Sequence, residues 1–438
     1  MWSSVRLLVA FNKFQKNNFR NTVNVYVRRI HTTETKSCNN LKLEECDVIT
    51  LFGKNYIRDE YTNVTPHVLS LLSRNLHLLK NHPLNLIKQR IVRYMYGSYL
   101  NRRGNPVFSV YDKLAPVVTV QQNFDNLLIP EDHPSRKKSD SYYINSNYLL
   151  RPHTSAHQKE LIMSGLDNFL VIGDVYRRDE IDAKHYPVFH QCEGVRLLSS
   201  YELFSNIPNG KDMKLFHDDV RRAEKQGCHT IEATNLMEKD LKDCLVGLMK
   251  RLFGGSIEYR WTESYFPFTH PSWELEINYR GDWLEVLGCG IMEQEILNRA
   301  GAGEKIGWAF GLGLERLAMK LYSIPDIRLF WTHDTGFLSQ FDVKDIDAPI
   351  TYQAISKYPQ CTNDISFWVP EGYHPNDFFD IARNVGGEVI EQVHKVDEFF
   401  HLKHKRQSYC YRIVYRHMER TLSQKEVNEI HKKIEDAA

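Results

Sequence analysis

The chain has almost no excess of charge of either sign and no long apolar run. Its 438 residues include 56 Lys and Arg against 55 Asp and Glu, which excludes a uniformly basic coat for nucleic acid but allows a local basic face. No apolar stretch approaches the ~18 residues that a membrane-spanning helix needs, so we expect no membrane partner. The 22 Phe, 23 Tyr and 7 Trp exclude disorder of the whole chain. At about 150 residues per domain, the length suggests two or three domains.

Cysteine is also sparse, with eight residues and no Cys-x-x-Cys pair. This spacing argues against a zinc ribbon and against a thioredoxin-like redox motif. In a chain of this length the cysteines are expected to be reduced, mostly buried thiols, which fits a reducing compartment.

Residues 1–33 contain no Asp or Glu, although they include six Lys and Arg and many Ser, Thr and Asn. This composition is typical of a mitochondrial transit peptide and predicts location in the mitochondrial matrix. The alternative is a disordered basic tail. Residues 34–60 are expected to form a short polar lead-in.

Strands outnumber helices over residues 61–330, without strict alternation of strand and helix. Helix starts are predicted at Thr65-Pro66, where a capping residue precedes a proline, and at Asn81-His82-Pro83. The pattern predicts an α+β domain with an antiparallel sheet and flanking helices. Strands are predicted at 168–176, 189–198, 273–279 and 283–289, and helices at 155–165, 213–225, 237–253 and 311–322.

A predicted linker, residues 331–347, leads to a separate unit at 348–438. The order of elements there is β-α-β-β-α, which is most of a ferredoxin-like α/β sandwich. Its usual last strand is missing, so the sheet is either incomplete or closed by a strand from residues 348–356.

Three segments carry residues suited to phosphate or aromatic ligands. Residues 307–316, Gly-Trp-Ala-Phe-Gly-Leu-Gly-Leu-Glu-Arg, combine a glycine-rich strand end with an arginine in the first turn of a helix. Residues 173–193 gather Arg, Lys and His in a loop between two predicted strands. Residues 266–268, Phe-Pro-Phe, can line an aromatic slot. Taken singly, each is also compatible with a tight turn, an exposed hairpin or a piece of core.

Glu285 lies in an apolar predicted strand, where it is expected to be a buried carboxylate that needs a cation or another partner.

Together these segments resemble phenylalanyl-tRNA synthetase, a class II aminoacyl-tRNA synthetase, over residues 61–438, and they are most similar to its single-chain mitochondrial form. The C-terminal unit resembles the family's ferredoxin-fold anticodon-binding domain, which begins near residues 356–359. The other signatures follow in family order: residues 123–136 resemble the segment after motif 1, residues 176–193 motif 2, residues 266–268 the phenylalanine pocket, and residues 311–316 motif 3.

The resemblance implies ATP-dependent attachment of phenylalanine to tRNA(Phe) through phenylalanyl-adenylate, in mitochondrial translation. It implies L-phenylalanine, ATP and tRNA(Phe) as partners, with Mg²⁺ as cofactor. A monomer is the simplest expectation, because the chain carries its own anticodon-like unit. No segment is left over for a separate editing module.

Roles for residues follow from the same resemblance. Arg177 is expected to bridge the amino-acid carboxylate and the α-phosphate, Arg316 to hold the γ-phosphate, and Glu285 to bind Mg²⁺. The rest of the expected ATP site comprises Lys184, His185, Tyr186, Phe189, Gly311 and Gly313. The expected phenylalanine and adenylate site comprises His153, Thr154, Ser155, Ala156, His157, Gln158, Gln191, Cys192, Glu193, Phe266, Phe268, Gly288, Ala309 and Phe310.

Residues 401–420 form the most basic segment of the C-terminal unit, with six Lys and Arg against the single acid Glu419. We expect this segment to contact tRNA phosphates, although a solvated sheet surface is the usual role of such a charge run. The expected tRNA contacts are Lys403, Lys405, Arg406, Arg412 and Arg416.

Three alternative functions remain open. A catalytically inactive, synthetase-like RNA-binding protein would be expected to lack Arg177, Glu285 or Arg316, which are all present. A class II enzyme for another amino acid is disfavoured by the two phenylalanines at 266 and 268. An amide ligase that uses no tRNA is disfavoured by the C-terminal unit.

Overall fold

A computed structural model describes residues 47–354, 358–402 and 405–438 of the chain. The predicted transit peptide, residues 1–33, lies outside the described residues, as do residues 34–46 of the predicted lead-in. The described part of the lead-in forms a hairpin of β1 (Val48–Leu51) and β2 (Lys54–Ile57).

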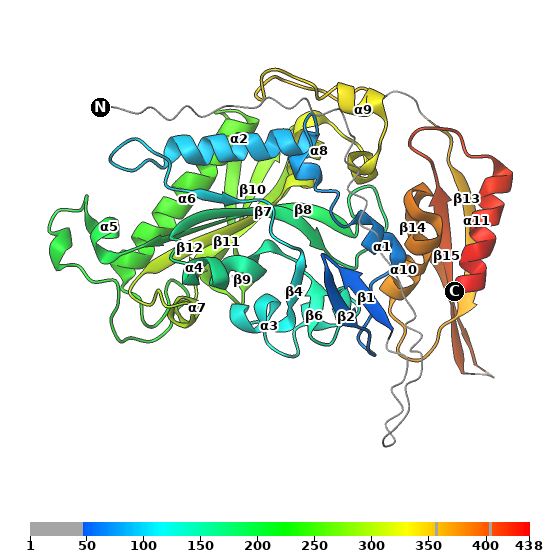
Figure 1. The fold of residues 1–438 in the computed structure, drawn as a ribbon, viewed down its shortest axis with the longest axis horizontal. Coiled ribbons are helices and arrows are strands. Elements are labelled where there is room, and N and C mark those ends of the chain that lie inside the picture. The colour runs from blue at the N-terminus through cyan, green and yellow to red at the C-terminus, as the bar shows by residue number, and fades with distance from the viewer. Residues whose placement is uncertain (1–46, 355–357, 403–404) are drawn as a thin grey trace, which may run out of the picture.

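The largest element is a seven-stranded sheet with the order β3-β7-β8-β12-β11-β10-β9. Every neighbouring pair is antiparallel except β3 and β7, which confirms the predicted antiparallel architecture. Figure 1 shows this sheet in the middle of the molecule. Its strands are β3 (Ser109–Tyr111), β7 (Asn168–Tyr176), β8 (Val188–Leu198), β9 (Glu258–Phe266), β10 (Thr269–Tyr279), β11 (Asp282–Met292) and β12 (Ile306–Gly313).

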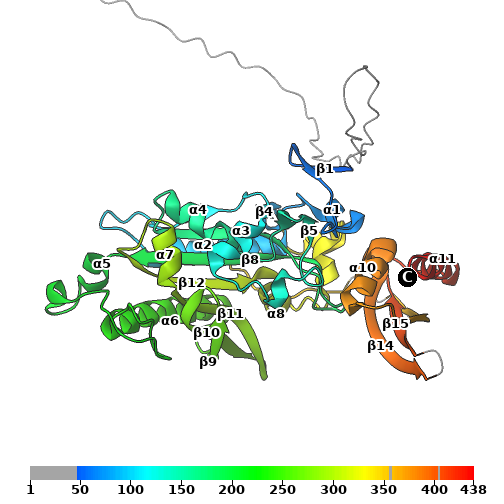
Figure 2. The same cartoon turned by 90° about the horizontal axis from the view of Figure 1, so that it is seen from below.

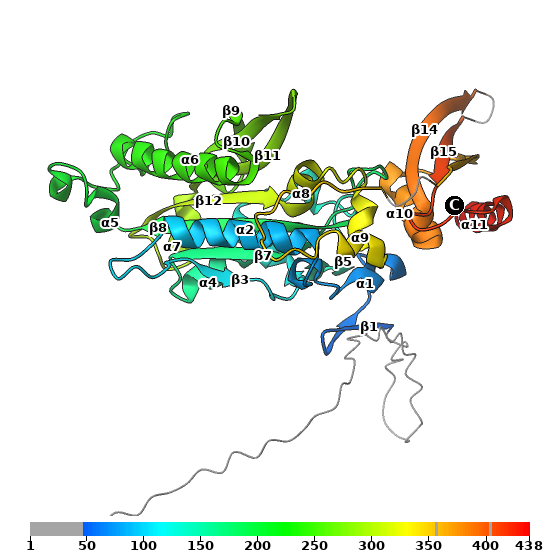
Figure 3. The same ribbon diagram turned by 90° about the horizontal axis from the view of Figure 1, so that it is seen from above.

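Three helices, α2 (Pro83–Ser98), α6 (Ile231–Phe253) and α8 (Leu314–Tyr322), cover one face of the sheet (Figure 3). Helix α2 begins as the sequence predicts, because the His82 side chain accepts a hydrogen bond from the backbone N–H of Leu84 and proline follows at the first helical position. Leu84, Ile87 and Ile91 recur at helical spacing, and all three are fully buried against the core.

A second core lies on the opposite face of the same sheet. Successive strand residues point to opposite faces, so Leu170 and Ile172 of β7 enter the first core whereas Phe169 and Val171 enter the second. The second core is covered by a small sheet of β4 (Val117–Thr119), β6 (Tyr148–Leu150) and β5 (Tyr143–Asn145) and by the short helices α3 (Val120–Asn123), α4 (Gln158–Met163) and α7 (Gln294–Arg299) (Figure 2).

The helix predicted at residues 213–225 is wrong. This stretch follows α5 (Ser200–Phe204) and a short 3₁₀ turn, and it contains two isolated bridges, Phe216 with His229 and Arg222 with Lys225. Leu215 is the single buried apolar residue among the thirteen predicted to be helical. Met213, Phe216 and Val220 recur at helical spacing, but the backbone of this stretch pairs with residues just beyond it. The N–H groups of His217 and Asp219 donate to the carbonyls of Cys228 and Gly227.

The C-terminal domain consists of β13 (Cys361–Trp368), α10 (Pro375–Gly386), β14 (Ile390–His401), β15 (Arg406–Tyr415) and α11 (Gln424–Ala437). Its sheet has the order β13-β15-β14, and Tyr411, Ile413 and Tyr415 form part of its buried core, as their alternation predicts. Among the described residues no fourth strand joins this sheet, and residues 348–354 form no ladder. The strand suggested from 348–356 is therefore absent from the part of that range that is described.

Residues 331–347, predicted as a linker, are packed against the catalytic domain. They contain α9 (Thr335–Ser339), and Phe337 and Phe341 are buried in the main core. Asp347 forms ion pairs with Arg90, Arg93 and Arg251. Phe337 and Phe341, four residues apart, pack into the core, and Asp347 pairs with arginines of α2 and α6. These contacts hold residues 331–347 against the catalytic domain.

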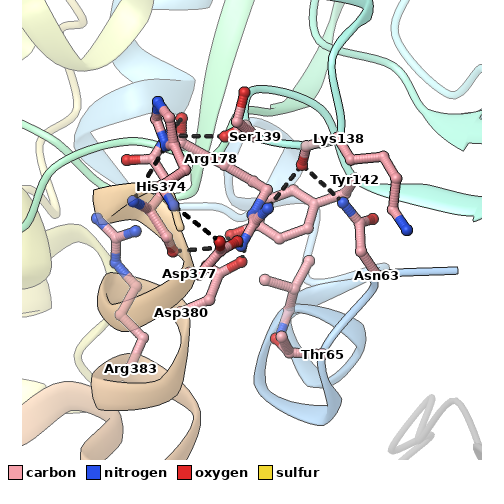
Figure 4. Close-up of polar contacts among 12 residues, drawn as sticks. Asn63, Thr65, Lys138, Ser139, Tyr142, Arg178, His374, Asp377, Asp380 and Arg383 are labelled. Atoms are coloured by element: carbon pink, nitrogen blue, oxygen red, sulfur yellow. Dashed lines mark hydrogen bonds and ion pairs between the residues drawn. The ribbon is translucent and has the colours of Figure 1, made fainter. Parts of the chain in front are cut away.

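The C-terminal domain docks onto the loop that follows β7 (Figure 4). The Arg178 guanidinium donates to Asp380 at 2.6 Å and to Asp377 at 2.9 Å, and the Tyr142 hydroxyl donates to Asp380 at 2.7 Å. Arg383 donates to the carbonyls of Asp179 and Glu180. This loop is therefore bound on one side by the C-terminal domain.

We expect Asp380→Ala to weaken this docking strongly, because it leaves the buried Arg178 guanidinium without its main partner, at a cost of about 3–5 kcal/mol. Tyr142→Phe removes only one hydrogen bond to Asp380 and should cost about 1 kcal/mol. The melting temperature and the rate of proteolysis in the loop at 177–187 measure the effect. Equal behaviour of Asp380→Ala and the wild type would contradict the role of this cluster.

Candidate active site

A cavity of about 420 Å³ opens on the face of the large sheet where β8, β12, β11 and β10 lie side by side. Most of the residues predicted from motifs 2 and 3 and from the aromatic segment line it. The predicted residues that line it are His153, Ser155, Gln158, Arg177, Lys184, His185, Tyr186, Phe189, Gln191, Glu193, Phe266, Phe268, Glu285, Gly288, Ala309, Phe310, Gly311, Gly313 and Arg316.

The floor of the cavity is made by the pairing of β8 with β12. Gly311 pairs with Glu193 and Gly313 pairs with Gln191, so alternation points these positions to the same face. A Cβ atom at Gly311 or Gly313 would meet no atom within 4 Å. The two glycines therefore leave the floor low enough for a flat ligand to lie against the backbone.

Gly288 makes room for a side chain of the protein. A Cβ atom there would lie 2.7 Å from the Phe266 ring, so the ring occupies the place of the missing side chain. The Phe266 and Phe268 rings are 5.9 Å apart with an interplanar angle of 14°, on the turn between β9 and β10. The aromatic segment thus forms the apolar end of the cavity, as predicted.

The Phe310 side chain belongs to the hydrophobic core as well as to the cavity lining. Its ring faces the first core, where it fills the space above Gly194, whose Cβ would lie 2.3 Å from the ring. Ala309, the preceding residue of β12, faces the second core and the cavity.

Glu193 forms a buried polar corner. Its carboxylate accepts hydrogen bonds from Thr154 at 3.0 Å, from Gln158 at 2.6 Å and from Ser155. Burial raises the pKa of Glu193 to about 7, although the three hydrogen bonds act in the opposite direction. A carboxylate of this kind is suited to bind a cationic ligand group that enters the cavity.

His153 stands beside this corner, with its ring 6.2 Å from that of Phe268. Burial and the neighbouring Arg177 lower the pKa of His153 to about 3, so its imidazole is neutral at physiological pH. Its buried Nδ1 atom has no hydrogen-bond partner among the described residues.

Four predicted site residues lie outside the lining. Thr154 is buried behind Glu193, and His157 is bonded to the Arg151 guanidinium at 2.8 Å. Ala156 and Cys192 belong to the two hydrophobic cores. These residues were predicted because they lie within the motif segments. The alternation of β8 and the turn of the 3₁₀ helix at Thr154–His157 direct their side chains away from the cavity.

Arg177 and Arg178 are adjacent in sequence, but their side chains face different parts of the protein. Arg177 is exposed to the cavity, where its Nε donates to the Pro152 carbonyl at 2.9 Å and its guanidinium lies 5.1 Å from the centre of the Phe189 ring. Arg178 faces the C-terminal domain, as described above. The pair marks the point where the cavity and the domain contact share one loop.

Arg316 and Glu285 stand together at the mouth of the cavity. Arg316 lies in the first turn of α8, as predicted, and its Nη1 atom is 3.1 Å from Glu285 Oε1. The prediction that Glu285 is buried is wrong, because half of its side chain is exposed. Leu275 pairs with Leu287 and Glu276 with Glu285, so Val286 is an extra residue at a bulge that interrupts the alternation.

The loop after Arg177 carries the remaining predicted ATP residues. Asp182 accepts hydrogen bonds from the backbone of Lys184 and from the backbone and Nδ1 of His185, and this contact raises the pKa of His185. The Tyr186 ring stacks on Trp331 at 5.3 Å and its hydroxyl donates to Glu388 of the C-terminal domain. Glu180, Asp182 and His185 form the one group with metal-ligand spacing among the described residues, and it does not include Glu285.

Sequence reasoning missed Glu315. Its buried carboxylate accepts hydrogen bonds from the backbone N–H of His190 at 2.8 Å and from His190 Nδ1 at 2.7 Å, which ties the start of α8 to β8. The sequence offered one signal for Glu315, which is its position next to Arg316. It could not identify the partner, His190, which is 125 residues away. Five other missed lining residues lie within two positions of predicted ones: Asp179, Thr269, Val286, Leu287 and Cys289. Glu274, which pairs with Gly288 across β10 and β11, and Ile327 were missed as well.

The predicted tRNA residues lie in the C-terminal domain, away from the cavity lining. Lys403 falls outside the described residues, and the Arg406 guanidinium lies 5.0 Å from the Trp368 ring. Arg412 is paired with Asp364 at 2.8 Å and Arg416 with Glu391 at 3.0 Å. The basic segment is thus partly neutralised by acids on β13 and β14, which a count along the sequence overlooks.

No helix in the described part of the chain is long and apolar enough to cross a membrane. The described cysteines are all free thiols, in agreement with the expectation from their spacing.

Comparisons with known proteins agree with this geometry. Residues 69–205 and 227–341 match the family described as the tRNA synthetases class II core domain (F), and residues 356–438 match the ferredoxin-fold anticodon binding domain. The mouse protein "Phenylalanine--tRNA ligase, mitochondrial" is 58% identical over 392 residues, which cover 89% of this chain and 87% of the relative. The Drosophila melanogaster protein "Probable phenylalanine--tRNA ligase, mitochondrial" is 58% identical, with 88% and 89% covered.

A bacterial relative, "Phenylalanine--tRNA ligase alpha subunit" of Acinetobacter baylyi, is 34% identical and covers 62% of this chain. Matches of this extent and identity establish that the chain belongs to the phenylalanine–tRNA ligase family of class II aminoacyl-tRNA synthetases.

Proposed function

We propose that this cavity binds phenylalanine and ATP, forms phenylalanyl-adenylate, and passes the phenylalanyl group to tRNA(Phe). The observation that carries the proposal is one cavity that holds an apolar aromatic slot, the buried carboxylate Glu193 and the two cationic side chains Arg177 and Arg316. Each part suits one portion of the substrates: the phenyl ring, the ammonium group and the triphosphate. An inactive RNA-binding relative has no need for this combination.

At the amino-acid end, Glu193 binds the ammonium group of phenylalanine, assisted by His153, Ser155 and Gln191. The Phe266 and Phe268 rings pack against the substrate ring, with Ala309 at its edge. Arg177 then orients the substrate carboxylate toward the α-phosphate of ATP. Such placement supplies much of the rate, because the two reactants meet in a fixed orientation.

In the first step a carboxylate oxygen of phenylalanine attacks the α-phosphorus, a new P–O bond forms, and the bond to pyrophosphate breaks. Arg177 and Arg316 stabilise the negative charge that builds up on the phosphate oxygens. In the second step the 2′-hydroxyl of the terminal tRNA adenosine attacks the acyl carbon and AMP leaves. Lys184, His185 and Tyr186 surround the ATP, and Phe189 lies beneath the adenine.

A magnesium ion fits the donors at the cavity mouth. Glu285 is half-exposed and already attracts the cationic Arg316, and Glu274 also lines the cavity. Carboxylate oxygens together with phosphate oxygens are the ligands that Mg²⁺ usually takes. Bound there, Mg²⁺ would neutralise charge on the phosphates, and Glu285 is the residue that would hold it.

We also propose that the chain acts as a monomer in the mitochondrial matrix, after removal of a transit peptide within residues 1–33. The catalytic domain (residues 61–330) and the anticodon-binding domain (residues 348–438) are joined in one chain, which supports action as a monomer. Light scattering of the purified protein tests the oligomeric state, and import into isolated mitochondria tests the location.

Aminoacylation tests the function directly. We expect the full chain to attach radiolabelled phenylalanine to tRNA(Phe), and Arg177→Ala to abolish the reaction while the melting temperature stays close to that of the wild type. A folded wild-type chain that binds tRNA(Phe) without charging it would support the inactive alternative.

Tyrosine should be activated at a measurable rate. A slot that selects by shape rejects a ligand with one extra hydroxyl by only about 10²-fold. We therefore expect kcat/KM for tyrosine about 10² below that for phenylalanine, and no hydrolysis of tyrosyl-tRNA by this chain. A much larger ratio, or clear deacylation, would contradict selection by shape alone.

The affinity for phenylalanine should rise with pH through about 7. Below that pH the Glu193 carboxyl is protonated in the free enzyme and cannot pair with the ammonium group, whereas above it the carboxylate is charged. We expect kcat/KM for phenylalanine to increase about tenfold per pH unit on the acid side and to level off above pH 7. Glu193→Gln should bind phenylalanine more weakly than the wild type, and its kcat/KM should no longer rise with pH toward 7. An identical pH profile in that variant would show that Glu193 does not bind the ammonium group.

Neutralising Lys403, Lys405 and Arg406 to Gln should raise KM for tRNA. Each lost phosphate contact lowers the magnitude of the slope of log affinity against log salt concentration by about 0.7–0.9, so the three substitutions together should lower it by about 2–3. Adenylate formation should stay unchanged. Arg420→Gln is the matched control, because Arg420 is already paired with Glu426 at 2.8 Å. If the triple variant behaved like this control, the basic segment would be an ordinary solvated surface.

A further inference from the structure

We propose that Arg221 and Gln226 are positioning residues for the aromatic slot, although neither lines the cavity. They belong to residues 216–229, here called the 216–229 loop, which lies between β8 and α6 in the chain. This inference rests on the proposed function, since it assigns the loop a part in phenylalanine binding. The match to the class II core domain covers residues 69–205 and 227–341, so most of this loop lies outside the matched ranges.

The loop has a defined conformation of its own. Backbone hydrogen bonds join His217 to Cys228 at 3.0 Å and Asp219 to Gly227 at 3.1 Å. The buried Lys225 ammonium group binds the Asp219 carboxylate at 3.0 Å and the His229 carbonyl at 3.0 Å. A segment braced in this way can hold other parts of the protein in place.

Gln226 connects the loop to the turn that carries Phe266 and Phe268. Its amide is buried and makes three hydrogen bonds to backbone groups. The Nε2 atom donates to the carbonyls of His270 and Met292, each at 2.9 Å, and the Oε1 atom accepts from the N–H of Gln294 at 2.9 Å. One side chain therefore joins the start of β10 to the end of β11.

Arg221 acts on the same turn through Glu293. Its guanidinium binds both carboxylate oxygens of Glu293, at 2.6 and 3.2 Å. The backbone N–H of Glu293 donates to the carbonyl of Phe268 at 3.0 Å. In addition, His270 Nε2 donates to the carbonyl of Arg222 at 2.6 Å, so the turn and the loop contact each other from both directions.

The turn needs this support because its own strand pairing is interrupted. Between Thr269 and Ser272 the register shifts against both neighbouring strands, β9 and β11. The loop supplies partners for backbone groups where the regular ladder is broken, and buried backbone groups require such partners. Displacement of the turn would move the Phe266 and Phe268 rings, and small displacements in a binding slot are costly for activity.

The test is to measure KM for phenylalanine and for ATP separately, in amino-acid-dependent ATP–pyrophosphate exchange with the full chain. We expect Arg221→Ala to raise KM for phenylalanine about threefold and Gln226→Glu about tenfold, because a carboxylate cannot donate to the two carbonyls. KM for ATP should change less than twofold. Arg221→Lys should restore part of the loss.

Arg222→Ala is the matched control, since it removes the same charge from the same loop, but among the described residues the Arg222 side chain pairs with Asp219 and not with Glu293. It should leave both KM values unchanged. Arg221 is half-exposed, so its alanine variant is expected to fold and can decide the question even if Gln226→Glu does not.

Equal KM values for phenylalanine in Arg221→Ala and Arg222→Ala would overturn the inference. So would a parallel rise of KM for ATP, which would indicate a general loss of structure. A wild-type chain that activates no amino acid would instead remove the proposed function, and this inference with it.

Discussion

The pairing of β8 with β12 is the constraint on which the site depends. Alternation along β8 directs Gln191 and Glu193 to the cavity and His190 and Cys192 to the core. The same pairing sets Gly311 and Gly313 opposite the two cavity residues, so the floor is low where the polar groups stand. Glu315 then bonds both the backbone and the ring of His190, which fixes where α8 begins and therefore where Arg316 lies. A shift of one residue in this register would reverse every one of these assignments.

A second theme is that both ends of the cavity are supported from outside the motifs. At one end, which we propose binds ATP, the loop after Arg177 is bound to the C-terminal domain: Arg178 pairs with Asp380, Tyr186 with Glu388, and Ile181 is buried with the C-terminal core. At the other end, the 216–229 loop bonds to the start of β10 and the end of β11, next to the turn with the two phenylalanines. The placement of the lining residues depends on these polar contacts, and the buried ones are costly to break.

The sequence predicted correctly the features that depend on local patterns and on the motif residues. Strand periodicity, proline-initiated helices and the motif residues led to the sheet and to most of the cavity lining. The failures share one physical cause, which is that pairing with another segment of the chain decides the outcome. Glu285 becomes exposed through a bulge opposite Leu275, and Arg412 is neutralised by Asp364 on another strand. Residues 213–225 bond to residues 227–228 instead of forming a helix, and the role of Glu315 depends on His190. Periodicity along one segment contains no information about pairing with another.

The central claim is that the cavity is an amino-acid-activating site selective for phenylalanine. The most direct measurement is ATP–pyrophosphate exchange with the purified chain across all twenty amino acids, without tRNA. The account predicts strong exchange with phenylalanine, weak exchange with tyrosine and none above background with the others. Exchange with a non-aromatic amino acid, or no exchange from a folded protein, would contradict it.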